Sequence, residues 1–175
     1  MPTEPDEIEL SGDELREVAR YAAACARRVL PLFERGVPGD TRPREALDAA
    51  EEFAGGGRRT AGLRRHAWAA YKAAGEAAAP AAASDAARAA SHAAGAAYLH
   101  PRASAHQVKH ILGAAAHAAR AEELTTAPVA PGALEWARDH APAAVVVVLA
   151  RFPAAPAGGG RVGELMRELD AALRA

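Results

Sequence analysis

The sequence has one cysteine, few aromatic residues and no long apolar run. Cys25 has no second cysteine to pair with, so an internal disulfide is excluded, and its apolar helical surroundings predict a buried thiol. The longest apolar stretch, residues 141–150, is about half of the ~20 residues that a helix needs to cross a bilayer. The acidic start MPTEPDEIEL lacks the basic and apolar regions of a signal peptide. We therefore expect a cytoplasmic protein that does not associate with membranes.

Acidic residues are missing from two long stretches in the middle of the chain. Residues 54–75 carry five basic residues and no acid, and residues 86–121 carry four basic residues, five histidines and no acid. Residues 1–14 carry six acids and no base, so the formal net charge of −1 hides a strong asymmetry. A basic middle suits an acidic protein or an anionic small molecule. Nucleic acid is not expected as a partner, because the pI is near neutral and no recognition motif is present.

Alanine fills 51 of the 175 positions, and aromatic residues make up only 5% of the chain. Alanine has the highest helix propensity, and its small side chain lets helices approach closely. Larger apolar residues recur among the alanines at helical spacing, as between Leu15 and Phe33. The sequence therefore predicts an all-α protein, a compact bundle of about eight helices.

Local signals place these helices along the chain. Ser11 and Glu14 have the spacing of a capping box, so the first helix begins there and runs to about residue 35, with Pro31 bending its last turn. Proline, glycine and capping residues delimit the other helices. They are expected at about residues 41–53, 60–78, 84–99, 103–123, 132–140, 142–152 and 162–174.

These helices are expected to form three segments. Residues 1–10 are a flexible acidic arm, residues 11–124 an alanine-rich helical core domain, and residues 125–175 a C-terminal helical extension packed on that core. Pro128 and Pro131 bracket the linker, and the glycines at 158–160 form a flexible joint. The aromatic residues expected to fill the core are Trp68, Tyr71 and Tyr98.

His106 and His110 are spaced four residues apart, which puts both on one face of a helix. This is the spacing of a zincin metal pair, but Gln107 stands where the catalytic glutamate would be. A third ligand would have to come from His92 or His100, and no acid lies nearby in the sequence to orient the imidazoles. We therefore expect no metal and no cofactor.

A second polar cluster, Asp40-Thr41-Arg42-Pro43-Arg44, lies at a predicted helix start. Two arginines are unfavourable there because the helix dipole presents positive charge at that end. In one interpretation Asp40 caps the helix and pairs with an arginine. In the other, Arg42 or Arg44 holds a carboxylate or a phosphate, which suits the fork of a guanidinium group.

Several motifs resemble one family. The run ACARRVLPLFE at 24–34 is followed by GDTRPREA at 39–46, by a glycine-bearing loop, and by ARAASHA at 87–93. In this order they are similar to the Imm-5-like family, whose name assigns its members a role as immunity proteins, and the similarity covers about residues 12–121. The resemblance implies a helical protein associated with toxin systems.

Two hypotheses about function follow from these observations. The first is an immunity or binding protein that neutralises a partner or ligand without catalysis, its basic middle meeting an acidic toxin. The alternative is a binding protein or enzyme for an anionic small molecule, with an arginine and histidine pocket between helices. The candidate ligand-binding residues are Asp40, Arg42, Arg44, His92, Tyr98, His106, Lys109 and His110.

Overall fold

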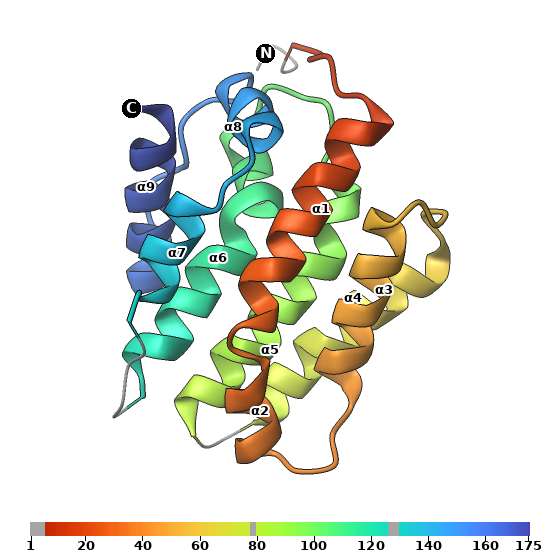
Figure 1. The fold of residues 1–175 in the computed structure, drawn as a ribbon, viewed down its shortest axis with the longest axis vertical. Coiled ribbons are helices and arrows are strands. Elements are labelled where there is room, and N and C mark those ends of the chain that lie inside the picture. Colours follow the sequence, from red (N-terminus) through yellow and green to blue (C-terminus); the bar gives the residue numbers. More distant parts are fainter. Residues whose placement is uncertain (1–5, 78–79, 126–129) are drawn as a thin grey trace, which may run out of the picture.

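The computed structural model describes residues 6–77, 80–125 and 130–175, and within them the protein is a bundle of α-helices without a β-sheet (Figure 1). The predicted all-α bundle is confirmed. The helices are α1 (Gly12–Arg27), α2 (Leu30–Gly36), α3 (Arg42–Ala54), α4 (Ala61–Glu76), α5 (Ala81–Gly95), α6 (Val108–Glu123), α7 (Ala133–Asp139), α8 (Ala143–Ala150) and α9 (Gly160–Arg174). Two short 3₁₀ helices, η1 (Ala96–Tyr98) and η2 (Ala105–Gln107), lie between α5 and α6.

The described residues contain one α-helix more than expected, because the first predicted helix is divided. α1 starts with the predicted capping box, in which the Ser11 side chain accepts from the Glu14 amide and Glu14 accepts from the Ser11 amide. It ends at Arg27, and α2 begins at Leu30 with Pro31 in its first turn. Proline lacks an N–H and its ring collides with the carbonyl four residues earlier, so Pro31 begins a new helix instead of bending the old one.

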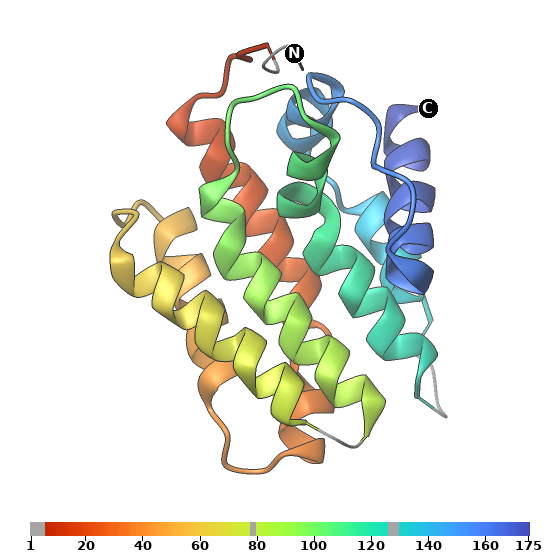
Figure 2. The same ribbon diagram turned by 180° about the vertical axis from the view of Figure 1, so that it is seen from behind.

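Helix α5 lies at the centre of the bundle and contacts α1, α2, α3, α4 and α6. Figure 2 shows α4, α5 and α6 side by side across the back of the molecule. Eight alanines of α5 are buried. Because none of them projects beyond a methyl group, neighbouring helices approach α5 closely on several sides.

Two of the aromatic residues expected in the core are instead on the surface. Trp68 is 61% exposed and Tyr71 is 46% exposed. The buried residues of α4 include the small Ala70, Ala73 and Ala74, whereas the two large rings lie on the solvent-exposed surface of this helix. The prediction for Trp68 and Tyr71 was therefore wrong, whereas Cys25 is buried as predicted and burial raises the pKa of its thiol to about 12.

The described part of the N-terminal arm, residues 6–10, is attached to the bundle. The Ile8 amide donates to the Pro101 carbonyl at 3.0 Å, and the Ala103 amide donates to the Asp6 carbonyl at 2.8 Å. Arg151, which follows α8, donates to the Glu9 carbonyl at 2.8 Å and to both carboxylate oxygens of Glu14. This part of the expected flexible arm is thus held in place. Residues 1–5 lie outside the described residues.

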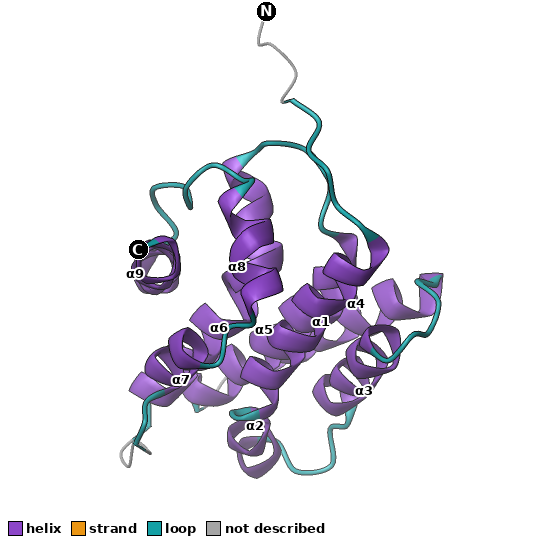
Figure 3. Cartoon of the chain, turned by 45° about the horizontal axis from the view of Figure 1, so that its top comes forward, coloured by secondary structure: helices purple, strands orange, loops and turns teal. Residues whose placement is uncertain are grey.

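The C-terminal helices pack beside α6 and α1 (Figure 3). α9 contacts α6 and α7, and α8 contacts α1. Arg161 of α9 forms an ion pair with Glu123 of α6, and Tyr21 of α1 donates to the Ala137 carbonyl of α7 at 2.8 Å. The proposed linker falls partly on residues 126–129, which lie outside the described residues. Among the described helices, none has the length and apolar character needed to span a membrane.

The lowered pKa of Glu14 should make the stability of the fold depend on pH in the acidic range. Hydrogen bonds from Arg151 and then from Ser11 lower the pKa of Glu14 from 4.5 to about 2. The lowered pKa means that Glu14 stabilises the fold fully above pH 4.5, and that this contribution is lost as the pH falls through about 2. We expect Glu14→Gln to lower the free energy of unfolding at pH 7 by about 1 kcal/mol, as for loss of a helix cap.

Urea denaturation between pH 7 and pH 2 tests this expectation. The difference in unfolding free energy between wild type and Glu14→Gln should disappear as the pH falls. Glu17→Gln is the matched control, because among the described residues Glu17 pairs with Arg20 alone, on the surface of the same helix, and such pairs contribute little. Equal losses of unfolding free energy in the two variants would show that the contact between Glu14 and Arg151 stabilises the fold no more than an exposed ion pair does.

Candidate functional site

The structure distributes the eight predicted site residues over separate places. Three of them, His92, His106 and Lys109, line one pocket between α5, α6 and the start of α9. Asp40, Arg42 and Arg44 lie at the start of α3 and are not part of its lining. Tyr98 lines a different pocket with Arg59 and Arg64, and His110 bonds within the bundle.

The arginines at the start of α3 are engaged by carboxylates of the same chain. Arg42 donates to Asp40 at 2.6 Å and to Glu76, at the end of α4, at 2.6 Å. Asp40 also accepts from the Arg42 backbone amide at 3.1 Å, and Arg44 donates to Glu34 at 2.7 Å. The hydrogen bond from Arg42 holds the pKa of Asp40 below its ordinary value. The predicted pairing of Asp40 with an arginine is thus confirmed, whereas the N-cap of α3 is Thr41, without a side-chain capping hydrogen bond, and not Asp40. Ligand binding by these residues stays a prediction.

The pocket between α5, α6 and α9 has a volume of about 520 Å³. Besides His92, His106 and Lys109, it is lined by three polar residues that sequence reasoning did not select, namely Asp85, Arg88 and His117. Asp85, Arg88 and His92 follow one another at helical spacing on α5, and Lys109 and His117 lie two turns apart on α6. The opposite wall comes from the loop at 156–159 and from Val162, Gly163 and Met166 of α9.

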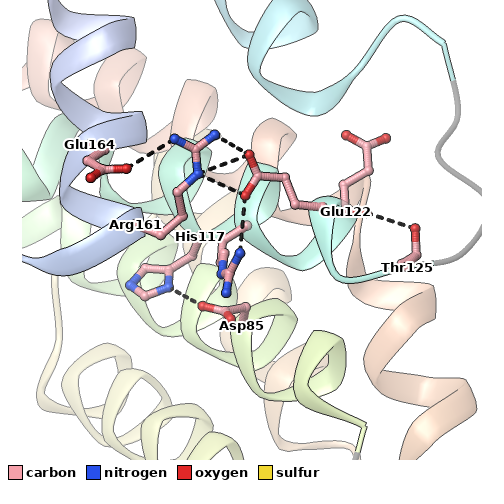
Figure 4. Close-up of polar contacts among 8 residues, drawn as sticks. Asp85, His117, Glu122, Thr125, Arg161 and Glu164 are labelled. Atoms are coloured by element: carbon pink, nitrogen blue, oxygen red, sulfur yellow. Dashed lines mark hydrogen bonds and ion pairs between the residues drawn. The ribbon is translucent and has the colours of Figure 1, made fainter.

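Asp85 and His117 form a hydrogen-bonded pair across two helices. The Nδ1 atom of His117 lies 2.8 Å from Oδ1 of Asp85, and both side chains are largely buried. Figure 4 shows them pointing toward each other from α5 and α6. The His92 ring stacks on His117 with 4.9 Å between the ring centroids. The expectation that no acid orients these imidazoles was therefore wrong, because Asp85 lies one residue before the acid-free range.

His92 packs against α6 where that helix carries a glycine. A Cβ atom at Gly113 would lie 2.5 Å from Nδ1 of His92, which is closer than atoms can approach. Burial, followed by the charges of His117 and His110, lowers the pKa of His92 to about 3. His92 is therefore neutral at physiological pH and stacks on His117 without carrying a charge.

His106 and His110 do not act as the predicted pair. His106 is exposed in η2, whereas Nδ1 of His110 lies 3.1 Å from the Gly95 carbonyl at the end of α5. The chain changes from 3₁₀ to α-helix at Val108, so the regular four-residue spacing does not hold across it. Within residues 6–77, 80–125 and 130–175, no three His, Cys, Asp or Glu side chains are grouped to hold a metal ion.

A second polar feature covers the outer side of α4 and the end of α5. We name it the α4–α5 face and define it by six residues: Arg59, Arg64, Trp68, Tyr71, Arg88 and Tyr98. Trp68 and Tyr71 stack with 5.3 Å between their ring centroids. The Cζ atom of Arg88 lies 5.2 Å above the Tyr71 ring, and that of Arg64 lies 4.5 Å above the Tyr98 ring. Arginine side chains thus stack on aromatic rings at this surface, where Trp68 and Tyr71 are exposed and Arg88 and Tyr98 are half-buried.

The fold and these features define a helical protein with a polar pocket and an arginine–aromatic surface. Residues 9–144 match the family described as Imm-5 like putative immunity protein, and the chain belongs to this family. The match confirms the resemblance and extends it past residue 121 through α7. No curated protein and no solved structure matches the chain.

The lowered pKa of His92 should make a second contribution to the loss of folding stability at low pH. Its folded pKa of about 3 is below the ordinary value of 6.5, so its contribution to stability is full above pH 6.5 and declines as the pH falls toward 3. We expect the stability difference between wild type and His92→Gln to narrow over that range. In NMR spectra the His92 imidazole should not titrate between about pH 5 and 8, and a midpoint near its ordinary value would contradict the burial argument.

Gly113 offers a test of the packing around His92. We expect Gly113→Ala to lower the free energy of unfolding by about 1–3 kcal/mol, because its methyl group displaces the His92 ring. Gly75→Ala is the control, since a Cβ there meets nothing within 4 Å and alanine favours a helix by about 1 kcal/mol. Urea denaturation measures the unfolding free energy of both variants. Equal changes in the two would show that the contact between residue 113 and His92 does not limit the packing.

Proposed function

We propose that this protein acts as an immunity protein by binding an acidic partner toxin on its α4–α5 face, without catalysing a reaction. The family supplies the immunity role. The observation that carries the location is the stacked, exposed pair of Trp68 and Tyr71. Water-exposed large rings are unfavourable in an isolated protein, and tryptophan, tyrosine and arginine are the residues that contribute most to protein interfaces.

The charge around these rings indicates the chemistry of the partner. Residues 54–75 contain no acid, so α4 presents Arg64, Arg65 and Lys72 without a carboxylate among them until Glu76, which pairs with Arg42. Within the described residues Arg59, Arg64 and Arg88 form no ion pair, and their guanidinium groups lie over Tyr98 and Tyr71 instead. A partner with surface carboxylates would supply the missing counter-charges.

The rings also hold the arginines ready for such a partner. An arginine stacked on an aromatic ring loses less side-chain freedom on binding than an extended one, and it keeps its N–H groups at the edge for carboxylates. Tyr98 is itself fixed, because its hydroxyl donates to the Thr60 carbonyl at 2.8 Å. The surface is therefore ordered before the partner arrives.

A toxin-protection assay with single variants tests the proposal. The products of neighbouring genes are each co-expressed with the protein to find one whose toxicity it suppresses, and affinity is measured on that purified pair. We expect Trp68→Ala and Tyr71→Ala each to weaken binding by about tenfold or more, as at interface hot spots, and to reduce protection. Binding should also weaken when NaCl is raised from about 50 to about 500 mM.

Val147→Ala is the matched control, because Val147 is 51% exposed on α8, away from the α4–α5 face. It should bind as wild type does. All three substitutions remove exposed side chains, so stability should change by no more than about 0.5 kcal/mol. Unchanged affinity in both aromatic variants would reject this face as the binding surface.

A further inference from the structure

Two positively charged side chains that line the pocket between α5, α6 and α9 form no ion pair with a carboxylate of the described residues. Arg88 and Lys109 line this pocket, and neither forms an ion pair within the described residues. The pocket has one carboxylate, that of Asp85, which is engaged by His117 at 2.8 Å. Elsewhere in the bundle, arginines such as Arg27, Arg42 and Arg161 are paired with nearby acids. The lining of this open pocket thus carries a surplus of positive charge.

The Asp85–His117 pair fixes an imidazole in the lining of this pocket. Because Nδ1 of His117 faces Asp85, its other ring nitrogen, Nε2, is the one that can meet a ligand. A carboxylate behind an imidazole fixes the orientation and tautomer of the ring, with Nδ1 donating to Asp85. A ring that also carries a proton on Nε2 can donate to a bound anion. His92 stacks on the same ring and limits its rotation.

The remaining wall of the pocket consists of apolar side chains and of glycines, which expose main-chain atoms. Val162 and Met166 face the cations across the space, and Gly158, Gly159 and Gly163 complete that wall. A Cβ atom at Gly163 would lie 1.9 Å from the Gly158 carbonyl oxygen, so only glycine allows the loop to pack this closely on α9. The volume of about 520 Å³ lies in the range of ~300–1,000 Å³ typical of small-molecule sites.

We infer that this pocket binds a small phosphate monoester, with Arg88, Lys109 and His117 holding the phosphate and Val162 and Met166 contacting the organic part. The surplus positive charge in the lining is better neutralised by a phosphate monoester, which carries nearly two negative charges near neutral pH, than by a single carboxylate. The inference does not depend on the proposed partner surface. The two features share Arg88, which lies over Tyr71 and also lines the pocket.

Titration of the full-length protein with phosphate compounds tests this inference. The probes are inorganic phosphate and adenosine monophosphate, with acetate and NaCl at equal ionic strength as controls. ¹H–¹⁵N NMR spectra should show saturable shifts at the amides of residues 158–163 and at the His117 imidazole with both phosphate probes. Acetate and NaCl should give no saturable shifts. Saturation with acetate at similar concentrations, or the absence of saturation with phosphate, would overturn the inference.

The two lysines of the chain provide a matched pair of variants. Lys109→Glu should weaken binding of adenosine monophosphate by about tenfold or more, because it replaces a donor in the pocket by a like charge. Lys72→Glu makes the same change in net charge on exposed α4 outside the pocket lining, and it should change affinity by less than about twofold. Equal weakening in the two variants would indicate general electrostatic attraction and would reject the site.

A further set of variants separates this inference from the proposed function. Trp68→Ala should leave phosphate affinity unchanged, and Lys109→Glu should leave toxin affinity unchanged. Arg88→Ala should weaken both, because Arg88 belongs to both surfaces. A loss of phosphate binding in Trp68→Ala would contradict a pocket that is independent of the aromatic pair.

Discussion

Close packing of helices around α5 is the constraint from which the other features of this protein follow. Eight buried alanines let five helices contact α5, with backbones nearer than larger side chains would allow. Such a core buries little apolar surface per residue, so it is held by large side chains from neighbouring helices, among them Phe33, Leu47 and Ile111. A polar side chain on α5 can therefore remain only where a neighbouring helix makes room for it or bonds to it.

The polar residues of α5 satisfy this condition in different ways. Ser84 and Ser91 donate to carbonyls of α4, at 2.8 and 2.7 Å. His92 occupies the space left by Gly113 on α6, and Asp85 meets His117. Arg88 extends outward, where it lies over Tyr71 and borders the pocket. The pocket and the α4–α5 face thus arise on the two sides of one helix, and Arg88 joins them.

Local features of the fold could be predicted from the sequence, whereas features that depend on the pairing of helices could not. The capping box at Ser11 and Glu14 spans a single turn, so its residues identify it. Helical periodicity places Trp68 and Tyr71 on a common side of α4, but it does not say which side the bundle covers. The Asp85–His117 pair joins residues 32 positions apart, and only the packing of α5 on α6 brings them together. His106 and His110 were paired on the assumption of one continuous helix, which the change at Val108 breaks.

Hydrogen–deuterium exchange on a complex with a toxin that the protein neutralises is the most direct test of the proposed binding surface. We expect binding to slow exchange in residues 59–76 and 88–98, which carry the aromatic rings and their arginines, and to leave exchange in α7 and α8 unchanged. Slower exchange confined to α7, α8 and α9, with no change in α4, would contradict it.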